Sequence, residues 1–224
     1  MATSPGQHKD QRVGVFIDTQ NMYYSARYLF GSKVSFKNIV ADAVGDRRLI
    51  RAIAYVVATK GQEEKPFFDA LQKEGIELRE KELMEYQSGQ KKADWDVGLA
   101  VDVIRMLDML DVVVIVSGDG DFEPLIDYAK NRGRIVEVMG FRETSSMKSV
   151  AAADRFVNLS DDKKRYLMGK MRLRSEKAQE DVGRALERAT DQPEGISAPG
   201  VMQGKKGGRP PMTPEERRRR RLSF

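Results

Sequence analysis

The stretch Val112-Val113-Val114-Ile115-Val116-Ser117-Gly118-Asp119-Gly120-Asp121 decides which fold this chain can adopt. Its first five residues form an uninterrupted apolar run, which is typical of a parallel strand buried on both faces. A second run, Val13-Gly14-Val15-Phe16-Ile17, has the same character and is followed by Asp18. These two strands, each followed by aspartate, predict a parallel sheet in an α/β fold.

The rest of the chain repeats this pattern. Apolar runs alternate with stretches of helical period, as they do in the βα units of a parallel sheet. The runs occupy residues 12–17, 49–57, 75–79, 111–117 and 133–139. The helical stretches occupy residues 20–30, 36–44, 63–74, 94–109, 121–132 and 145–153. We therefore predict one α/β domain over residues 12–160, preceded by a flexible arm over residues 1–11.

The composition excludes several classes of site. The chain of 224 residues has no cysteine and one histidine, His8, which lies in the N-terminal arm. Disulfides, zinc sites built on Cys and His, and catalytic triads that use either residue are therefore excluded. No stretch reaches the roughly 20 apolar residues of a membrane span, and the first residues lack the apolar segment of a signal peptide. We expect a soluble, cytoplasmic protein without a membrane partner.

The positive charge is concentrated at the C-terminal end. Residues 1–160 carry 22 Lys and Arg against 24 Asp and Glu, whereas residues 161–224 carry 17 against 10. We interpret residues 161–190 as a charged helical extension and residues 191–224 as a disordered basic tail that contains the run Arg217–Arg221. Such a tail attracts polyanions and would add non-specific contact with DNA or RNA. A solvated tail without a partner explains the same composition.

Four aspartates lie at positions where proteins of this fold class bind ligands. In open α/β sheets, ligands bind outside the carboxyl ends of the strands, at the point where the strand order reverses. Asp18, Asp119 and Asp121 follow two strands, and Asp96 opens a helix whose apolar face is expected to pack on the sheet. Oxygen ligands favour hard cations, so we predict a Mg²⁺ or Mn²⁺ site at these four residues. A cation there would allow phosphodiester hydrolysis without a histidine base.

Each of these aspartates also has a structural explanation. Asp18 and Asp121 stand where the N-cap residues of helices stand, and Asp94 and Asp96 favour a helix N-terminus whether or not metal binds. Asp94 lies so close to Asp96 that it competes for the same role. Asn21 is placed to hydrogen-bond Asp18 or a metal-bound water, which would orient the carboxylate.

Basic residues near the acidic rim are candidates for contact with a substrate. The polar segment 81–93 follows a strand, and we predict that it is a mobile loop that carries Lys91 and Lys92 toward a scissile phosphate. Arg142 and Ser146, after the last long strand, extend that path. Such contacts position a nucleic acid without specifying its sequence.

Three aromatic residues are candidates for stacking on bases. Trp95 lies in a charged segment at a helix start, where packing against the sheet edge is the alternative. Tyr23 and Tyr24 are also candidates, but their helical spacing with Met22 and Leu29 favours a place in the core.

Four separated motifs, in order along the chain, resemble a NYN domain of the LabA-like group. They are Asp18 with Asn21, Lys92 through Asp102, Ser117 through Phe122, and Ser146 through Phe156. The resemblance covers roughly residues 12–160. It implies a PIN-like three-layer α/β/α fold whose central parallel sheet has the strand order 3-2-1-4-5, so that strands one and four lie side by side.

The same resemblance implies a function. Members of the group resemble metal-dependent ribonucleases, so the acidic residues become ligands of Mg²⁺ or Mn²⁺ or groups that position water. These acids are Asp18, Asp96, Asp119 and Asp121, with Asn21 and Ser117 as supporting residues. We therefore expect an endoribonuclease with RNA as its partner. The alternative is a non-catalytic nucleic-acid-binding regulatory module that keeps the acidic pocket, and the sequence leaves open whether the chain forms a homodimer.

Overall fold

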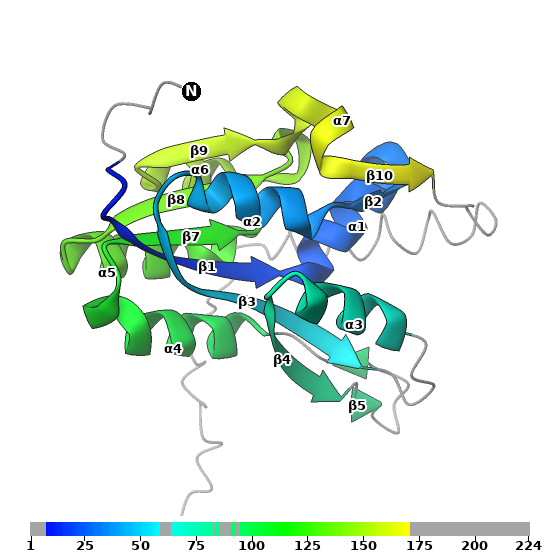
Figure 1. Ribbon diagram of the computed structural model, residues 1–224, viewed down its shortest axis with the longest axis horizontal. Coiled ribbons are helices and arrows are strands. Elements are labelled where there is room, and N and C mark those ends of the chain that lie inside the picture. The colour runs from blue at the N-terminus through cyan, green and yellow to red at the C-terminus, as the bar shows by residue number, and fades with distance from the viewer. Residues whose placement is uncertain (1–7, 59–63, 83, 86–90, 93–94, 171–224) are drawn as a thin grey trace, which may run out of the picture. The chain divides into compact units, whose positions relative to one another are not determined.

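Buried apolar strands form the centre of the fold. The computed structural model describes residues 8–58, 64–82, 84–85, 91–92 and 95–170. Within these ranges, six parallel strands make one sheet in the order β4-β3-β1-β7-β8-β9 (Figure 1). The strands are β1 (Arg12–Asp18), β3 (Arg48–Ala58), β4 (Glu77–Glu82), β7 (Val112–Val116), β8 (Ile135–Gly140) and β9 (Arg155–Asn158).

Helices cover both faces of this sheet, because the side chains on both faces are apolar. One face forms a core with α1 (Thr19–Phe30), α2 (Phe36–Val44) and α3 (Lys65–Lys73). The other face forms a second core with α4 (Asp96–Met106), α5 (Glu123–Asn131) and the end of α6 (Met147–Ala152). Every residue of β7 is buried, as the uninterrupted run predicts. The result is a three-layer α/β/α architecture.

The predicted strand order is confirmed. The five predicted runs correspond to β1, β3, β4, β7 and β8, and these strands have the order expected from the resemblance. Each predicted helical stretch also contains an observed helix. β9 adds a sixth strand at the edge, which the pattern did not predict because its four residues are only half-buried and form no continuous apolar run.

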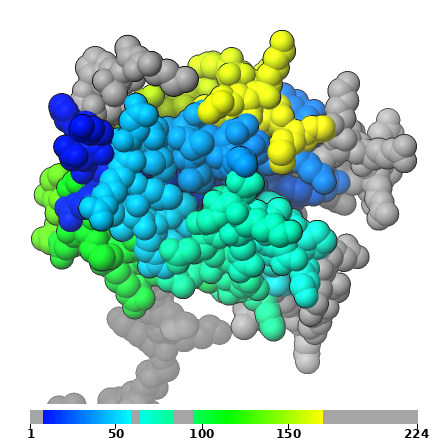
Figure 2. Space-filling view, in the orientation of Figure 1, coloured from blue at the N-terminus to red at the C-terminus, as the bar shows by residue number. Residues whose placement is uncertain are grey.

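Residues 161–170, the described part of the predicted helical extension, contain a short helix and a strand. They continue from a 3-10 turn, η4 (Leu159–Asp162), into the short helix α7 (Lys163–Tyr166) and the strand β10 (Leu167–Lys170), which pairs antiparallel with β2 (Ser32–Val34). Tyr166 is buried, and its hydroxyl donates a hydrogen bond to Asp42 Oδ2 at 2.8 Å. Figure 2 shows these C-terminal elements in yellow against the blue of α2 and β2. The remainder of the extension, the tail over residues 191–224 and residues 1–7 lie outside the described residues.

The prediction of a loop over residues 81–93 is wrong in part. β4 extends to Glu82, and two short strands, β5 (Met84–Glu85) and β6 (Lys91–Lys92), pair antiparallel with each other. None of the helices in the described ranges is long and apolar enough to cross a membrane.

Candidate metal centre

The candidate site lies at the carboxyl edge of the sheet, where the strand order reverses. β1 continues to β3 and β4 on one side, whereas β7 continues to β8 and β9 on the other. Ile17 of β1 pairs with Val116 of β7, so the next residues, Asp18 and Ser117, leave the sheet side by side. The Ser117 hydroxyl donates a hydrogen bond to Asp18 Oδ2 at 3.2 Å. Two strand ends with polar residues therefore meet at the edge where such folds bind ligands.

Asp18 has the capping role that its position allows. Its Oδ1 accepts the backbone N–H of Asn21 at 3.0 Å, which makes Asp18 the N-cap of α1. Asn21 supports the site through a different bond from the one expected, because its side-chain Oδ1 accepts the N–H of Gly118 at 2.9 Å. Asn21 thus links the start of α1 to the turn after β7.

The turn after β7 is held by its own side chains. Ser117 Oγ accepts the N–H of Asp119 at 3.1 Å, and Asp119 Oδ1 accepts the N–H of Asp121 at 2.9 Å. Asp119, rather than Asp121, is therefore the N-cap of the 3-10 turn η2 (Gly120–Phe122) that leads into α5. A Cβ atom at Gly118 would lie 2.6 Å from the carbonyl oxygen of Thr144, so only glycine allows the segment after β8 to approach this closely.

The segment after β8 closes over this turn. The Ser146 N–H donates to the Gly118 carbonyl at 2.8 Å, and the Ser149 hydroxyl donates to the Asp119 carbonyl at 2.8 Å. Ser146 also caps α6 by accepting the Lys148 N–H at 3.3 Å. Ser146, predicted as a substrate contact, thus has a structural role in this conformation. Ser149 is a buried supporting residue that sequence reasoning missed, since a serine within a helix gives no signal of such a bond.

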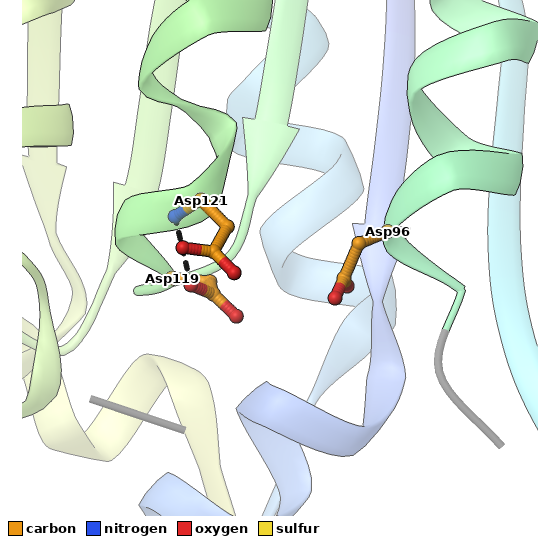
Figure 3. A group of neighbouring side chains, drawn as sticks. All are labelled: Asp96, Asp119 and Asp121. Carbon is orange, nitrogen blue, oxygen red and sulfur yellow. Dashed lines mark hydrogen bonds between the residues drawn. The ribbon is translucent and has the colours of Figure 1, made fainter. Parts of the chain in front are cut away.

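Asp96 reaches the same place from another element. It is the first residue of α4, where the positive end of the helix dipole favours a negative charge. Figure 3 shows Asp119 and Asp121 on the η2 side and Asp96 on the α4 side, with their carboxylates facing the space between. One ligand atom from each of the three lies within 4.8 Å of the others. Asp18 is not a member of this group of three, and its oxygens accept the bonds described above.

The three carboxylates fit a hard divalent cation. Mg²⁺ holds oxygens at about 2.1 Å in an octahedron, so two ligands of one ion lie roughly 3 to 4.2 Å apart. The 4.8 Å limit on the separation of the observed ligand atoms is close to this range. Among the described residues, no lysine or arginine forms an ion pair with Asp119 or Asp121. The carboxylate oxygens of the three residues are the ligands that Mg²⁺ and Mn²⁺ prefer.

Burial and mutual repulsion act on the acids of this edge. Removal from water raises the pKa of Asp18 from 3.8 to about 6, and the charge of Asp119 adds to this effect while the bonds from Asn21 and Ser117 oppose it. Burial likewise raises the pKa of Asp119, and the charge of Asp121 adds to it. A bound cation would remove this electrostatic cost.

Of the basic residues predicted to contact a substrate, Arg142 is the one whose side chain the structure describes. Lys91 and Lys92 form β6, but their side chains are outside the description, and Asp94 lies outside the described residues altogether. Arg142 is exposed, and its guanidinium carbon lies 5.7 Å from the centre of the Phe156 ring. Arg142 thus offers a charged group at the surface, on the same edge as the segment that closes over the turn.

The aromatic candidates divide into packed and exposed residues. Trp95 is half-buried, and its indole N–H donates to the Val56 carbonyl at 2.9 Å. It therefore packs against the sheet, as the alternative to stacking on a base proposed. Tyr24 is half-buried and meets Tyr23 in an edge-to-face contact with ring centres 5.3 Å apart. Tyr23 is 37% exposed and accepts a hydrogen bond from Arg27 at 3.2 Å.

Comparisons with known proteins agree with this architecture. The model of the NYN domain family matches residues 12–160. The chain is 26% identical, over 162 residues, to the low amplitude and bright protein LabA of Synechococcus elongatus. This alignment covers 68% of the present chain and 86% of LabA. It is also similar to the crystal structure of a protein of unknown function from Vibrio parahaemolyticus, with 29% identity, a TM-score of 0.66, and coverage of 72% of this chain and 99% of the other. The chain therefore belongs to the NYN domain family.

Proposed function

We propose that this protein is a metal-dependent ribonuclease that hydrolyses RNA phosphodiester bonds at the candidate metal centre. The observation that carries the proposal is the convergence of Asp96, Asp119 and Asp121, from two separate elements, to within 4.8 Å. Membership of the NYN domain family supports it, because the family resembles metal-dependent nucleases. We propose the cytoplasm as its compartment, since a cysteine-free chain is compatible with a reducing environment.

In this proposal, the four acidic residues have two different roles. Asp96, Asp119 and Asp121 hold Mg²⁺ or Mn²⁺. A divalent cation there acidifies water and stabilises the charge that develops on the phosphoryl oxygens. We assign to Asp18, whose charge interacts with that of Asp119, the positioning of water beside the cation. The bonds from Asn21 and Ser117 fix the direction of its two oxygens.

Positive groups around the edge bind the RNA backbone in this proposal. We assign phosphate contacts to Arg142 and to Lys91 and Lys92, which position the strand without specifying its sequence. The basic tail over residues 191–224 adds a sequence-independent affinity that salt weakens.

A second candidate is a nucleic-acid-binding regulatory module without turnover. The name of the LabA relative specifies no reaction, which favours keeping this candidate. Such a module would bind RNA at the same edge and would not require a cation for binding.

The two candidates are separated by a cleavage assay. End-labelled single-stranded RNA, structured RNA and single-stranded DNA are incubated with the purified protein in Mg²⁺, Mn²⁺ or EDTA, beside Asp119→Asn. Metal-dependent cutting of RNA that the variant lacks supports the ribonuclease. Binding without cutting in every metal supports the regulatory module instead, and equal cutting of DNA and RNA would refute the RNA preference.

A further inference from the structure

Trp95 is the single tryptophan of the chain and directly precedes Asp96. Its indole is turned toward the sheet, where its N–H donates to the carbonyl of Val56 in β3 at 2.9 Å. The Lys81 ammonium lies over the same ring, with Nζ 5.4 Å from the ring centre. The place of Trp95 in the sequence and its contacts therefore point to a role within the protein, next to the candidate metal centre.

The Trp95 ring also packs on Tyr55, with ring centres 5.4 Å apart. Tyr55 is 1% exposed, and its hydroxyl donates to Asp102 Oδ2 at 3.2 Å. Arg79 of β4 donates to the same oxygen at 3.1 Å. Since Asp102 lies almost two turns along α4 from Asp96, Tyr55 holds this helix both at its start and near its middle.

Glycine at position 98 is required for the Trp95 ring to lie where it does. A Cβ atom at Gly98 would be 2.6 Å from Trp95 Cε3 and 2.9 Å from Cζ3, so the ring rests on the backbone of the first turn of α4. Trp95 is the N-cap residue of this helix, yet its side chain makes no capping hydrogen bond. The ring therefore contacts the first turn of α4 by packing and not by a capping hydrogen bond.

Strand β3 links the two sides of the candidate site. The Tyr55 carbonyl accepts a hydrogen bond from the Thr19 hydroxyl, and the next carbonyl, that of Val56, accepts the Trp95 indole. Thr19 follows Asp18 and Trp95 precedes Asp96. Two consecutive peptide groups of one strand therefore fix the elements that carry these acids, although β3 itself provides no carboxylate to the group of three.

We propose that Trp95 is a positioning residue that sets the distance of Asp96 from Asp119 and Asp121, and thereby the affinity of the centre for its cation. This inference rests on the proposed function, because it assumes that the three carboxylates bind a cation. Loss of a group that orients a metal ligand typically weakens metal binding or activity by about 10–100-fold.

The test is the affinity for Mn²⁺, measured from the free-ion signal in electron paramagnetic resonance, with RNA cleavage measured alongside. The variants are Trp95→Phe, which keeps a ring and removes the N–H, Trp95→Ala, which removes both, and Gly98→Ala, which displaces the ring. Ile39→Val is the matched control, since it shortens a fully buried side chain of α2 in the core on the other face of the sheet. Circular dichroism confirms that each variant is folded, and Trp95→Phe keeps the test valid if Trp95→Ala does not fold.

We expect Trp95→Phe to weaken Mn²⁺ binding by about tenfold and Trp95→Ala by more, with Ile39→Val unchanged within about twofold. Equal Mn²⁺ affinity of the wild type and Trp95→Phe would overturn the positioning role while leaving the metal centre intact. A change in KM for RNA with unchanged Mn²⁺ affinity would overturn it in favour of stacking. A wild type that binds no Mn²⁺ would overturn both this inference and the proposed function, whereas Mn²⁺ binding without cleavage would refute only the nuclease.

Discussion

Replacing Asp18 by asparagine should stabilise the metal-free protein at neutral pH. Asparagine retains an oxygen that can accept the Asn21 N–H, so the cap of α1 survives. Its amide can donate to Ser117 Oγ, which reverses the present bond, in which the Ser117 hydroxyl donates to Asp18 Oδ2. What disappears is the negative charge, whose burial and repulsion by Asp119 raise the pKa of Asp18 to about 6. The substitution therefore removes an electrostatic cost from the folded state.

The size and pH dependence of this effect follow from the pKa difference. An acid whose pKa is raised on folding does not lower the free energy of unfolding at pH values below its unfolded pKa of 3.8. Its full destabilising effect is present once the pH exceeds the folded pKa of about 6. At 1.36 kcal/mol per pKa unit, the stability gain of Asp18→Asn should rise from about 0.5 kcal/mol at pH 4 to about 3 kcal/mol at pH 7.5. For a domain of this size, that corresponds to an increase in Tm of roughly 6–12 °C.

Thermal and urea unfolding, followed by circular dichroism in EDTA at several pH values, measure this gain. Asp108→Asn is the control, because the Asp108 side chain is 84% exposed and precedes β7 at the opposite edge of the sheet. The control should change the free energy of unfolding by less than about 0.5 kcal/mol. An Asp18→Asn variant that is less stable than the wild type at pH 7.5, or whose gain does not depend on pH, would refute this reasoning.

Three further predictions concern other parts of the chain. Arg47 is buried, and its guanidinium bonds to Glu137 at 2.8 and 3.0 Å. Glu137→Gln leaves this charge without a counter-charge and should lower the free energy of unfolding, measured in urea titrations, by about 3–5 kcal/mol. A loss below about 1 kcal/mol would contradict this prediction. Asp111→Asn should be less stable than the wild type at pH 7, since Arg12 lowers the pKa of Asp111 from 3.8 to about 2. A lowered acid pKa stabilises the fold above the unfolded value, so this difference should disappear as the pH falls from 3.8 toward 2, and a constant difference would argue against it. Deleting residues 191–224 should weaken RNA binding in gel-shift assays at low salt and leave cleavage of short RNAs in place, whereas loss of all such cleavage would show that the tail takes part in the reaction.

The sequence predicts the sheet well because its strands are buried on both faces. A strand covered by helices on each side needs apolar residues at every position, and β7 shows this without exception. The short edge strand β9 has no such requirement, and its residues are half-buried. The elements over residues 161–170 escaped prediction because their docking depends on bonds with distant residues, such as that of Tyr166 to Asp42, which no local pattern records.

Prediction of the site was limited by the same difference between local and long-range information. The aspartates follow strand ends or open a helix, so their gathering at one edge follows from the topology. The sequence could not show which of the four aspartates come within 4.8 Å of one another, because that depends on where distant segments place their side chains. Asp18, for example, accepts a bond from Ser117, which is 99 residues away. The sequence around Trp95 is equally compatible with stacking on a base and with packing inside the protein. The packing role becomes visible only in the structure, where Trp95 bonds to the Val56 carbonyl and contacts the Tyr55 ring.

The most direct test of the central claim is the rate of RNA cleavage by Asp119→Asn in saturating Mn²⁺, compared with the wild type and with Asp108→Asn. The substituted asparagine retains an oxygen for the Asp121 N–H, so the η2 turn should stay folded while the cation loses a charged ligand. We predict that Asp119→Asn lowers the rate about a thousandfold, equivalent to roughly 4 kcal/mol of transition-state stabilisation, and that Asp108→Asn and the wild type cleave equally. Cleavage by Asp119→Asn at the wild-type rate, or wild-type cleavage that persists in EDTA, would contradict the assignment of a metal-dependent ribonuclease to this centre.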